Sequence, residues 1–295
     1  MQSFAAIARE ISAHIGARCM SSPEQRVSGG SINECYRWAG GAGAMFVKMG
    51  PAAALAMFEA EAAGLAELER ARAVRVPRVH ACGRAGEAAF LALEWIEPGA
   101  GGAECEARLG EALAALHAVT ERRFGWVRDN TIGRTPQANA LSGDWVEFFR
   151  ERRLRPQLEL AARNGFAQAL GAPGERLLGC MHRLLAGHRP AASLLHGDLW
   201  GGNWFASSTG EPVLFDPAVY YGDRETDLAM TRLFGGFGAA FYRSYQAAAP
   251  LPPGWEARVE LYNLYHVLNH ANLFGGAYIA QARRSLDHLL RLAEG

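Results

Sequence analysis

The N-terminal third of the chain changes its hydrophobic period several times, and each change predicts a different element. Phe4, Ile7, Ile11 and Ile15 recur at helical spacing, which predicts an amphipathic opening helix. Residues 27–47 then alternate short apolar runs of β type with glycine-rich turns. We expect these runs to form a three-stranded antiparallel start.

The alanine-rich segment that follows is predicted to form a helix of about twenty residues. Phe58, Leu65 and Leu68 lie on one stripe of this helix, and Glu61 lies on the same stripe. A buried carboxylate without a partner costs several kcal/mol. The predicted partner of Glu61 is Lys48, at the end of the preceding strand.

A buried strand is predicted at residues 88–93, and it runs into the segment 94–96. Residues 74–80 contain a proline, so they are expected to form a loop or an edge strand. The Pro- and Gly-rich stretch 98–102 breaks the pattern. We therefore place a domain boundary there, with one unit at residues 1–97 and a second at residues 98–295.

The second unit is predicted to be mostly helical. The short apolar runs 192–195 and 212–215 interrupt it, and each run leads directly into polar residues. The helical segments are expected at residues 109–116, 145–160, 176–185 and 255–292.

Composition narrows the classes of partner. The 295 residues exceed the usual limit of a single core. Thirty basic side chains balance thirty acidic ones, so no overall field would recruit nucleic acid or an anionic membrane. The sequence shows no signal peptide, no apolar run near the ~20 residues of a membrane span, and five scattered cysteines. We expect a cytoplasmic protein with a small-molecule partner.

The stretch 196–204 (HGDLWGGNW) carries the most specific chemistry, together with Asp216 at the end of an apolar run. Asp198 can accept the proton of an attacking hydroxyl. Asn203 and Asp216 can hold magnesium against phosphate oxygens, as magnesium-dependent phosphoryl transfer requires. This order of residues predicts a kinase site.

Two further parts complete the predicted site. Lys48 can neutralise the α- and β-phosphates of a nucleotide while Glu61 holds its ammonium group in place. A glycine-rich turn can cover the phosphates, because glycine lets main-chain N–H groups approach oxygen closely. The residues of this turn are Gly29, Gly30, Ser31, Ile32 and Asn33.

The chain resembles the fructosamine kinase (ketosamine kinase) family over nearly its whole length, within the kinase-like superfamily related to aminoglycoside phosphotransferases. The segment Phe215–Phe237 (FDPAVYYGDRETDLAMTRLFGGF) is the most specific to that family. The other matching stretches are Gly29–Asn33, Phe46–Lys48, Glu61–Leu65, Phe124–Trp126, Asp129–Gly133, Pro136–Gln137, His196–Trp204 and Leu261–Phe274.

This resemblance implies an α+β, bilobal, protein-kinase-like fold, with an antiparallel-sheet N-lobe and a mainly helical C-lobe. It also implies ATP and Mg²⁺ in the cleft. The implied reaction transfers the γ-phosphoryl group to the 3-hydroxyl of a ketosamine, a fructosamine, ribulosamine or erythrulosamine adduct of lysine. The substrate is expected as a small molecule or bound to protein, the activity as deglycation repair, and the protein as a monomer or weak dimer.

Carried over by position, the resemblance makes Asp198 the catalytic base, with Asn203 and Asp216 as the metal ligands. It makes Lys48 and Glu61 the pair that anchors the phosphates. It further implies an adenine-binding hinge whose backbone meets the base, formed by Glu94, Trp95 and Ile96.

The remaining polar and aromatic residues have less specific roles. Asp227 most resembles a C-lobe aspartate that accepts hydrogen bonds from the catalytic-loop backbone, and His196 is expected to orient the loop. Trp200 either stacks on the acceptor sugar or packs in the core. Asp223 and Glu225 are expected near the cleft mouth, where they would meet the acceptor's amine.

Two alternatives remain open. One is another small-molecule kinase of the same fold, acting on an aminoglycoside, choline or a related amino-alcohol. The other is a pseudoenzyme that binds nucleotide as a scaffold, although no catalytic part of the motif set is missing from this sequence.

Overall fold

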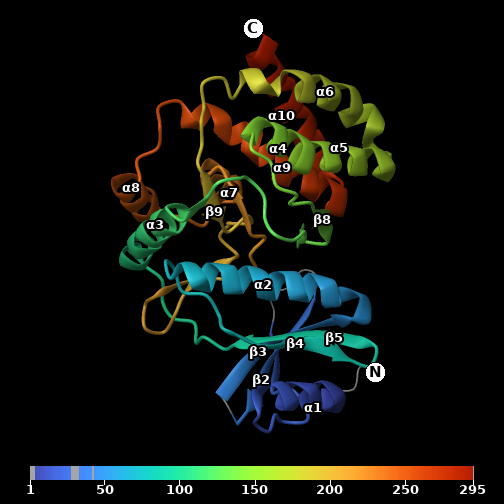
Figure 1. Ribbon diagram of the computed structural model, residues 1–295, viewed down its shortest axis with the longest axis vertical. Helices are drawn as coiled ribbons and strands as arrows, with labels where there is room; N and C mark the ends of the chain where they lie inside the picture. Colours follow the sequence, from blue (N-terminus) through green and yellow to red (C-terminus); the bar gives the residue numbers. More distant parts are fainter. Residues whose placement is uncertain (1–3, 28–32, 42, 295) are drawn as a thin grey trace.

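The computed structural model describes residues 4–27, 33–41 and 43–294, and it shows two lobes (Figure 1). The smaller lobe contains a five-stranded antiparallel sheet in the order β1-β2-β3-β5-β4. The strands are β1 (Gln25–Val27), β2 (Glu34–Gly40), β3 (Gly43–Pro51), β4 (Val79–Ala85) and β5 (Ala88–Glu94). The three predicted strands form, and the hairpin β4–β5 extends their sheet. The proline-containing segment leads into β4, which lies at the sheet edge as predicted.

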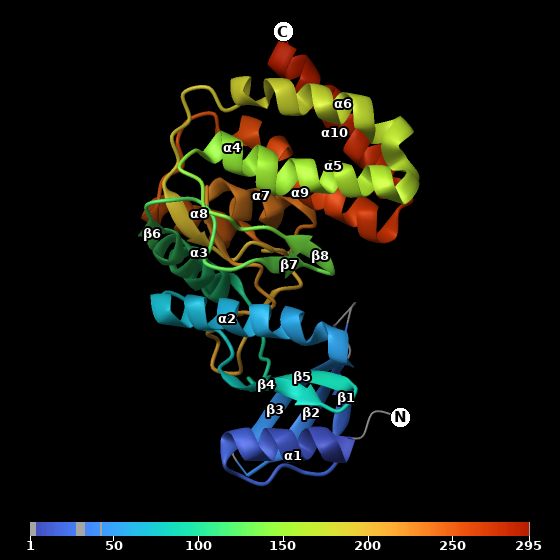
Figure 2. The ribbon, with the colours of Figure 1, turned by 45° about the vertical axis from the view of Figure 1, so that its right-hand side comes forward.

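Two helices cover opposite faces of this sheet, as Figures 1 and 2 show: α1 (Phe4–Ile15) and α2 (Leu55–Ala71). Side chains of a strand point alternately to its two faces. Phe90 and Ala92 of β5 accordingly pack with the apolar face of α1, while Leu91 and Leu93 belong to the core that α2 shares with the larger lobe. Because its side chains alternate between the two faces of the sheet, β5 packs towards both α1 and α2.

The larger lobe is mainly helical, as predicted. Its short strands form a three-stranded sheet, β12-β9-β6, and two hairpins, β7–β8 and β10–β11. Their bounds are β6 (Thr120–Glu121), β7 (Asn130–Ile132), β8 (Thr135–Gln137), β9 (Ala192–Leu195), β10 (Trp204–Ala206), β11 (Pro212–Leu214) and β12 (Tyr220–Gly222). The helices are α3 (Ala103–His117), α4 (Trp145–Phe149), α5 (Arg155–Ala161), α6 (Ala167–Cys180), α7 (Glu225–Leu233), α8 (Ala239–Ala248), α9 (Trp255–Phe274) and α10 (Ala277–Glu294).

Two predicted helices are interrupted in the structure. The helix expected at residues 145–160 contains a π-helical turn, Arg150–Leu154, between α4 and α5. The tail expected as one helical region is split into α9 and α10 by Gly275 and Gly276, which have positive φ angles of 66° and 57°. A left-handed backbone cannot continue a right-handed helix, and glycine adopts it at little cost.

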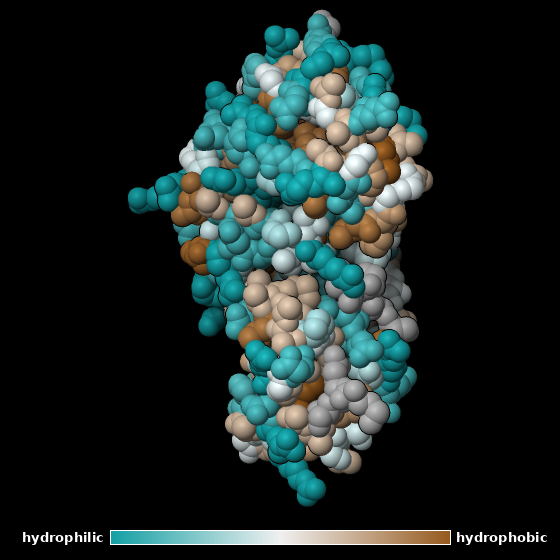
Figure 3. Space-filling model, turned by 90° about the vertical axis from the view of Figure 1, so that its right-hand side faces the viewer, coloured by the Kyte–Doolittle hydropathy of each residue, from teal (hydrophilic) through white to brown (hydrophobic). Residues whose placement is uncertain are grey.

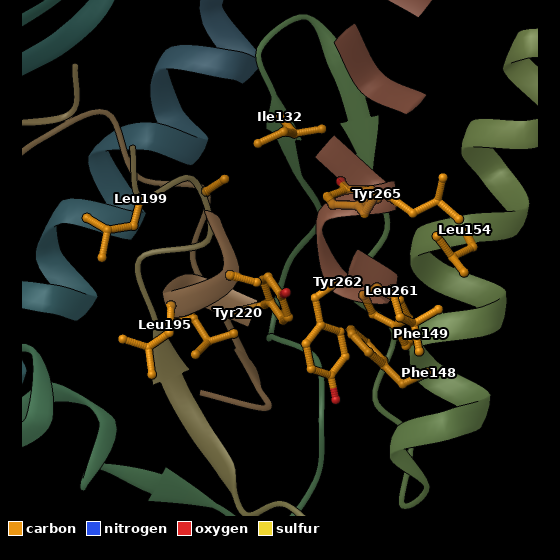
Figure 4. Close-up of a cluster of buried hydrophobic side chains, with 14 of the residues drawn as sticks. Ile132, Phe148, Phe149, Leu154, Leu195, Leu199, Tyr220, Leu261, Tyr262 and Tyr265 are labelled. Atoms are coloured by element: carbon orange, nitrogen blue, oxygen red, sulfur yellow. The ribbon is translucent and has the colours of Figure 1, made fainter. Parts of the chain in front are cut away.

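Figure 4 shows the aromatic centre of the larger lobe, where α4, α9 and β12 meet. Phe148, Phe149 and Tyr262 are fully buried there. The buried guanidinium of Arg153 lies 3.9 Å above the ring of Tyr220 and 4.7 Å from that of Phe148. It donates hydrogen bonds to the carbonyl of Ala138 and the amide oxygen of Asn139, both at 2.7 Å. Carbonyl oxygens and aromatic faces thus solvate this buried cation.

Helices α3 and α8 cross closely at Gly110, and a substitution there tests how tightly they pack. A Cβ atom at Gly110 would lie 2.4 Å from the carbonyl oxygen of Phe241. Gly110→Ala is therefore expected to lower the free energy of unfolding by about 1–3 kcal/mol, because α8 must move. Urea denaturation measures this change.

The matched control is Gly171→Ala in α6, where no atom lies within 4 Å of the added Cβ. An open helical position gains about 0.4–1 kcal/mol from the same substitution, because alanine restricts the unfolded chain. Equal effects of the two substitutions would contradict the close crossing at Gly110.

Candidate active site

A pocket of about 360 Å³ lies between the two lobes and collects most of the residues predicted from the sequence. Figure 3 shows the face at which the lobes meet, with the outline of the molecule narrowing between them. The predicted site residues that line the pocket are Asn33, Lys48, Glu61, Glu94, Trp95, Ile96, Asp198, Trp200, Asn203 and Asp216. Gly29, Gly30, Ser31 and Ile32 lie outside the described residues.

The first group in the pocket is a buried ammonium held between carboxylates. Lys48 projects from β3, and its Nζ lies 2.7 Å from Oε1 of Glu61 on α2. Its Nζ also contacts Oδ1 of Asp216, which belongs to the larger lobe. The side chain of Lys48 is only 6% exposed, so these carboxylates supply the compensation that its burial requires.

Burial and the neighbouring charges together raise the pKa values of both Lys48 and Glu61. Burial alone would lower the pKa of Lys48, but the carboxylates of Asp216 and Glu61 outweigh it and raise this pKa above its ordinary value. Burial raises the pKa of Glu61, although Lys48 opposes the shift. Lys48 therefore stays charged in the pocket and remains available to phosphate oxygens.

The catalytic loop follows β9 directly and is shaped by Gly197. This residue has a φ of 82°, and a Cβ there would lie 2.1 Å from the carbonyl oxygen of Ala218. Only glycine fits such a position. The carboxylate of Asp227 accepts hydrogen bonds from the backbone N–H groups of His196 (2.8 Å) and Gly197 (2.9 Å). The expected anchoring of the loop by Asp227 is confirmed.

His196 orients the loop, as predicted. Its Nε2 donates to the carbonyl of Phe215 at 2.9 Å, and its Nδ1 accepts from the backbone N–H of Asp198 at 3.3 Å. Burial lowers the pKa of His196, which favours this neutral tautomer. The imidazole thus fixes the backbone before Asp198 and after β11 with two directional hydrogen bonds.

Asp198 and Asn203 are brought together across one turn. The amide nitrogen of Asn203 donates to the backbone carbonyl of Asp198 (2.8 Å) and to its carboxylate (3.2 Å). Burial raises the pKa of Asp198 to about 7, and the charge of Asp216 acts in the same direction. A carboxylate with a pKa near neutral is suited to proton transfer.

The donor set of the pocket fits a hard divalent cation. Because the nitrogen of the Asn203 amide is committed to Asp198, its oxygen is the end left for a cation. Asp216 adds a carboxylate, and magnesium prefers oxygen ligands of these kinds. Asp216 has a left-handed backbone with φ of 55°, and such strain in a non-glycine residue clusters at functional sites.

Two buried hydrogen-bond networks next to the site were not predicted from the sequence. In the first, His117 on α3 contacts the carboxylate of Asp227 at 3.2 Å and the hydroxyl of Tyr245 on α8 at 2.9 Å. Hydrogen bonding by His117 lowers the pKa of Asp227 against the opposing effect of burial. These three residues are far apart in sequence, and nothing in the local pattern signals their contact.

The second network fastens the segment after Asp216. The amide nitrogen of Asn130 donates to the carbonyl of Val219 (2.8 Å), and that of Gln137 donates to the carbonyl of Ala218 (3.1 Å). Tyr265 on α9 donates its hydroxyl proton to Gln137 at 2.7 Å. Asn130 and Gln137 belong to stretches that carry the family resemblance, which is the signal that could have identified them.

The expected adenine-binding hinge follows β5. The backbone N–H of Trp95 is hydrogen-bonded to the carbonyl of Ala44 at 3.3 Å, so it is not free to meet a base. The carboxylate of Glu94 is paired with Arg75 and accepts from the backbone N–H of Arg78 at 3.2 Å. The side chain of Glu94 therefore has a structural partner, and its backbone N–H is bonded to the carbonyl of Arg78 at 2.8 Å.

The prediction that Asp223 and Glu225 lie at the cleft mouth is wrong. They are 1% and 2% exposed, and neither lines the pocket. Both oxygens of Glu225 are hydrogen-bonded to Arg258 at 2.7 Å, while Asp223 is bonded to His188 at 2.6 Å and to Tyr262. These carboxylates are neutralised inside the larger lobe and cannot meet a substrate's amine.

Trp200 lies at the rim of the pocket. Its side chain is 39% exposed, so the alternative of core packing is wrong. Its ring contacts that of Phe234 edge-on, with centroids 6.3 Å apart. Stacking of Trp200 on an acceptor sugar stays a prediction.

The two lobes, the Lys48–Glu61 pair, and Asp198 with Asn203 and Asp216 in one pocket define the protein as a kinase-like phosphotransferase acting on a hydroxyl group. The chain belongs to the fructosamine kinase family, whose profile matches residues 3–292.

Individual relatives agree with this assignment. The chain is 46% identical to a probable ketoamine kinase of Synechocystis sp., over 97% of this chain and 96% of that protein. It is 42% identical to a chloroplastic protein-ribulosamine 3-kinase of Arabidopsis thaliana, over 90% and 82%. A putative fructosamine-3-kinase structure from Thermobifida fusca superposes with a TM-score of 0.85 at 33% identity, over 97% and 98%. An aminoglycoside phosphotransferase shares the fold at 15% identity and a TM-score of 0.60, over 98% and 99%.

The buried ammonium gives a testable prediction. Lys48→Met leaves Glu61 without its partner, and is expected to lower the free energy of unfolding by about 3–5 kcal/mol at pH 8. The loss becomes smaller at pH 6, because Glu61 has a raised pKa in the folded state and its protonation removes the uncompensated charge. Urea titration at both pH values measures it.

The double variant Lys48→Met/Glu61→Leu serves as the control. It removes both charges, so it is expected to recover most of the lost stability and to lose the pH dependence. If the single and double variants unfold at the same denaturant concentration at pH 8, the pairing does not carry the stability assigned to it.

Proposed function

We propose that this protein is an ATP-dependent kinase that phosphorylates the 3-hydroxyl of ketosamines, the fructosamine, ribulosamine or erythrulosamine adducts of lysine. The observation that carries the proposal is the position of Asp198, Asn203 and Asp216 opposite the Lys48–Glu61 pair in one interlobe pocket. Family membership and relatives named ketoamine kinase and protein-ribulosamine 3-kinase support the ketosamine acceptor. The phosphorylated adduct then decomposes and frees the amine, so the proposed role of the activity is deglycation repair.

Each side chain has a definite task in this proposal. Asp198 accepts the proton of the sugar hydroxyl, and its raised pKa suits that step. Lys48, oriented by Glu61, binds nucleotide phosphates. Asn203 and Asp216 are the residues that would hold Mg²⁺, which supplies positive charge for the phosphate oxygens.

The proposal also assigns roles to the glycine-rich turn, the hinge and the two lobes. In the proposal, the glycine-rich turn Gly29–Asn33 covers the phosphates, and residues 94–96 meet adenine through backbone groups other than the N–H groups of Glu94 and Trp95. Residues 1–97 form the nucleotide-binding lobe, and residues 98–295 carry the catalytic loop and the acceptor side. The described helices include none that is both long and apolar enough to cross a bilayer. Action in the cytoplasm as a monomer or weak dimer remains a prediction.

Asp198→Asn tests the proposed base. The amide keeps the shape of the side chain but cannot accept the hydroxyl proton, so kcat on a ketosamine is expected to fall by roughly 10²- to 10⁴-fold. Nucleotide affinity, measured by calorimetry, should change little because Asp198 acts on the acceptor. A variant with full activity would refute the role of Asp198.

A panel of acceptors tests the substrate class. ADP release is expected with ribulose-lysine and fructose-lysine, and not with aminoglycosides or choline. The wild-type protein with Mg²⁺ and ATP is compared with Asp198→Asn, which corrects for any nucleotide hydrolysis unrelated to transfer. Turnover of an aminoglycoside or choline alone would replace the ketosamine assignment by the related small-molecule kinase alternative.

A further inference from the structure

A series of contacting aromatic rings, three of them exposed and two half-buried, begins at the pocket. Trp200 lines the pocket and contacts Phe234. The ring of Phe234 lies 4.8 Å from that of His270, which in turn lies 5.6 Å from Phe274 and 5.1 Å from Tyr278. We call these five residues the aromatic strip. They come from the catalytic loop, α7 and its end, α9 and α10.

Three rings of the strip are exposed, although large aromatic side chains are usually buried. Trp200, Phe234 and Phe274 are 39%, 40% and 59% exposed, and in the described ranges they are the Trp and Phe side chains that rank as exposed. Single exposed apolar residues are ordinary, but a contiguous group beside a pocket marks a binding surface.

Glycine contacts fix the inner half of the strip to the catalytic loop. A Cβ at Gly236 would lie 2.6 Å from Cα of Gly201, and a Cβ at Gly201 would lie 2.9 Å from the carbonyl oxygen of Gly235. The two backbones therefore touch directly. Because Gly201 follows Trp200 and Gly235 follows Phe234, this contact holds the two rings side by side.

The corner between α9 and α10 fixes the outer half. Gly275 and Gly276 turn the chain, so that the rings of Phe274 and Tyr278 face one another at 6.4 Å. Nδ1 of His270 is hydrogen-bonded to the carbonyl of His266 at 2.8 Å. Burial lowers the pKa of His270, so this ring is neutral and acts as an aromatic surface without a repelling charge.

We propose that the aromatic strip binds the carrier of the substrate, namely the lysine side chain and flanking peptide of a protein-bound ketosamine. This inference rests on the proposed function. The 3-hydroxyl of the sugar must reach Asp198, and the nucleotide must contact Lys48 on the opposite lobe. The amine end of the sugar then leaves past Trp200, two residues after Asp198, where the strip begins.

The chemistry of the strip suits this occupant. The secondary amine of a ketosamine is a cation at neutral pH, and cations are attracted to aromatic faces. The alkyl chain of lysine and its neighbours can bury apolar surface on the same rings. Phe274 and Tyr278 are three successive ring contacts away from Trp200, so a substrate attached to a peptide can cover more of the strip than a free amino acid adduct can.

The test compares two substrates on the wild-type protein and a double variant, Phe234→Ser/Phe274→Ser. The substrates are free ribulose-lysine and a blocked pentapeptide with one ribulosamine-modified lysine between apolar residues. Wild type is expected to show a kcat/KM about 10-fold higher on the peptide. The double variant is expected to lower the peptide-to-free ratio of kcat/KM about 10-fold, mainly through KM.

Two further variants protect the test against effects on folding. Phe274→Lys changes one side chain that is 59% exposed, and the loss of its ring should lower the same ratio, because only the peptide substrate reaches this end of the strip. Leu292→Ser on α10 is the matched control, since Leu292 is 53% exposed on the helix that also carries Tyr278. The control should keep the wild-type ratio.

The outcomes separate this inference from the function on which it rests. Equal kcat/KM of wild type on both substrates, or an unchanged ratio in the double variant, would overturn the role of the strip while leaving ketosamine phosphorylation intact. Absence of turnover on either substrate by wild type would overturn the proposed function, and the inference with it.

Discussion

The ammonium of Lys48 is the group on which the site depends, because it connects the two lobes. It extends from the sheet, pairs with Glu61 on α2 and contacts Asp216 of the larger lobe. Lys48 and Glu61 are buried together, with side chains 6% and 11% exposed, while Asp216 is 36% exposed. The buried charge of Lys48 is tolerable only in the presence of these carboxylates. The relative position of the lobes is thereby linked to the electrostatics of the pocket. A change in the charge on Asp216 necessarily changes what holds Lys48.

Close contacts between backbone segments fix the positions of the elements that carry these charged groups. A Cβ at Gly64 would lie 3.3 Å from Val219 and 3.4 Å from Pro217, so α2 packs directly on the segment that follows Asp216. Gly197 makes a similar approach to Ala218 from the catalytic loop. The same short segment is therefore contacted by the helix that carries Glu61 and by the loop that carries Asp198. Glycine at these points costs backbone entropy but sets the distances between the functional groups.

The sequence predicted those parts whose cause is local. The helical period of α1, the carboxylate on the apolar stripe of α2 and the polar residues after β9 and β11 all have short-range patterns. The amine contacts assigned to Asp223 and Glu225 were wrong, because their burial depends on Arg258 and Tyr262, which come from a later helix. The hydrogen bond between His117 and Asp227 likewise could not be predicted from the sequence. Long-range pairing of polar side chains leaves no periodic signal in a single sequence.

The two sides of the pocket differ in chemistry, and this difference explains how one site can handle two substrates. Charged groups, Lys48, Glu61 and Asp216, dominate the side shared with the sheet and suit phosphates and a cation. Trp200 also lines the pocket and, with Phe234 packed against it, offers aromatic faces instead. Asp198 lies between these regions, next to Asn203 in the loop that also carries Trp200. In the proposed reaction, an acceptor held by aromatic contacts would reach Asp198 without competing for the charges that suit the nucleotide.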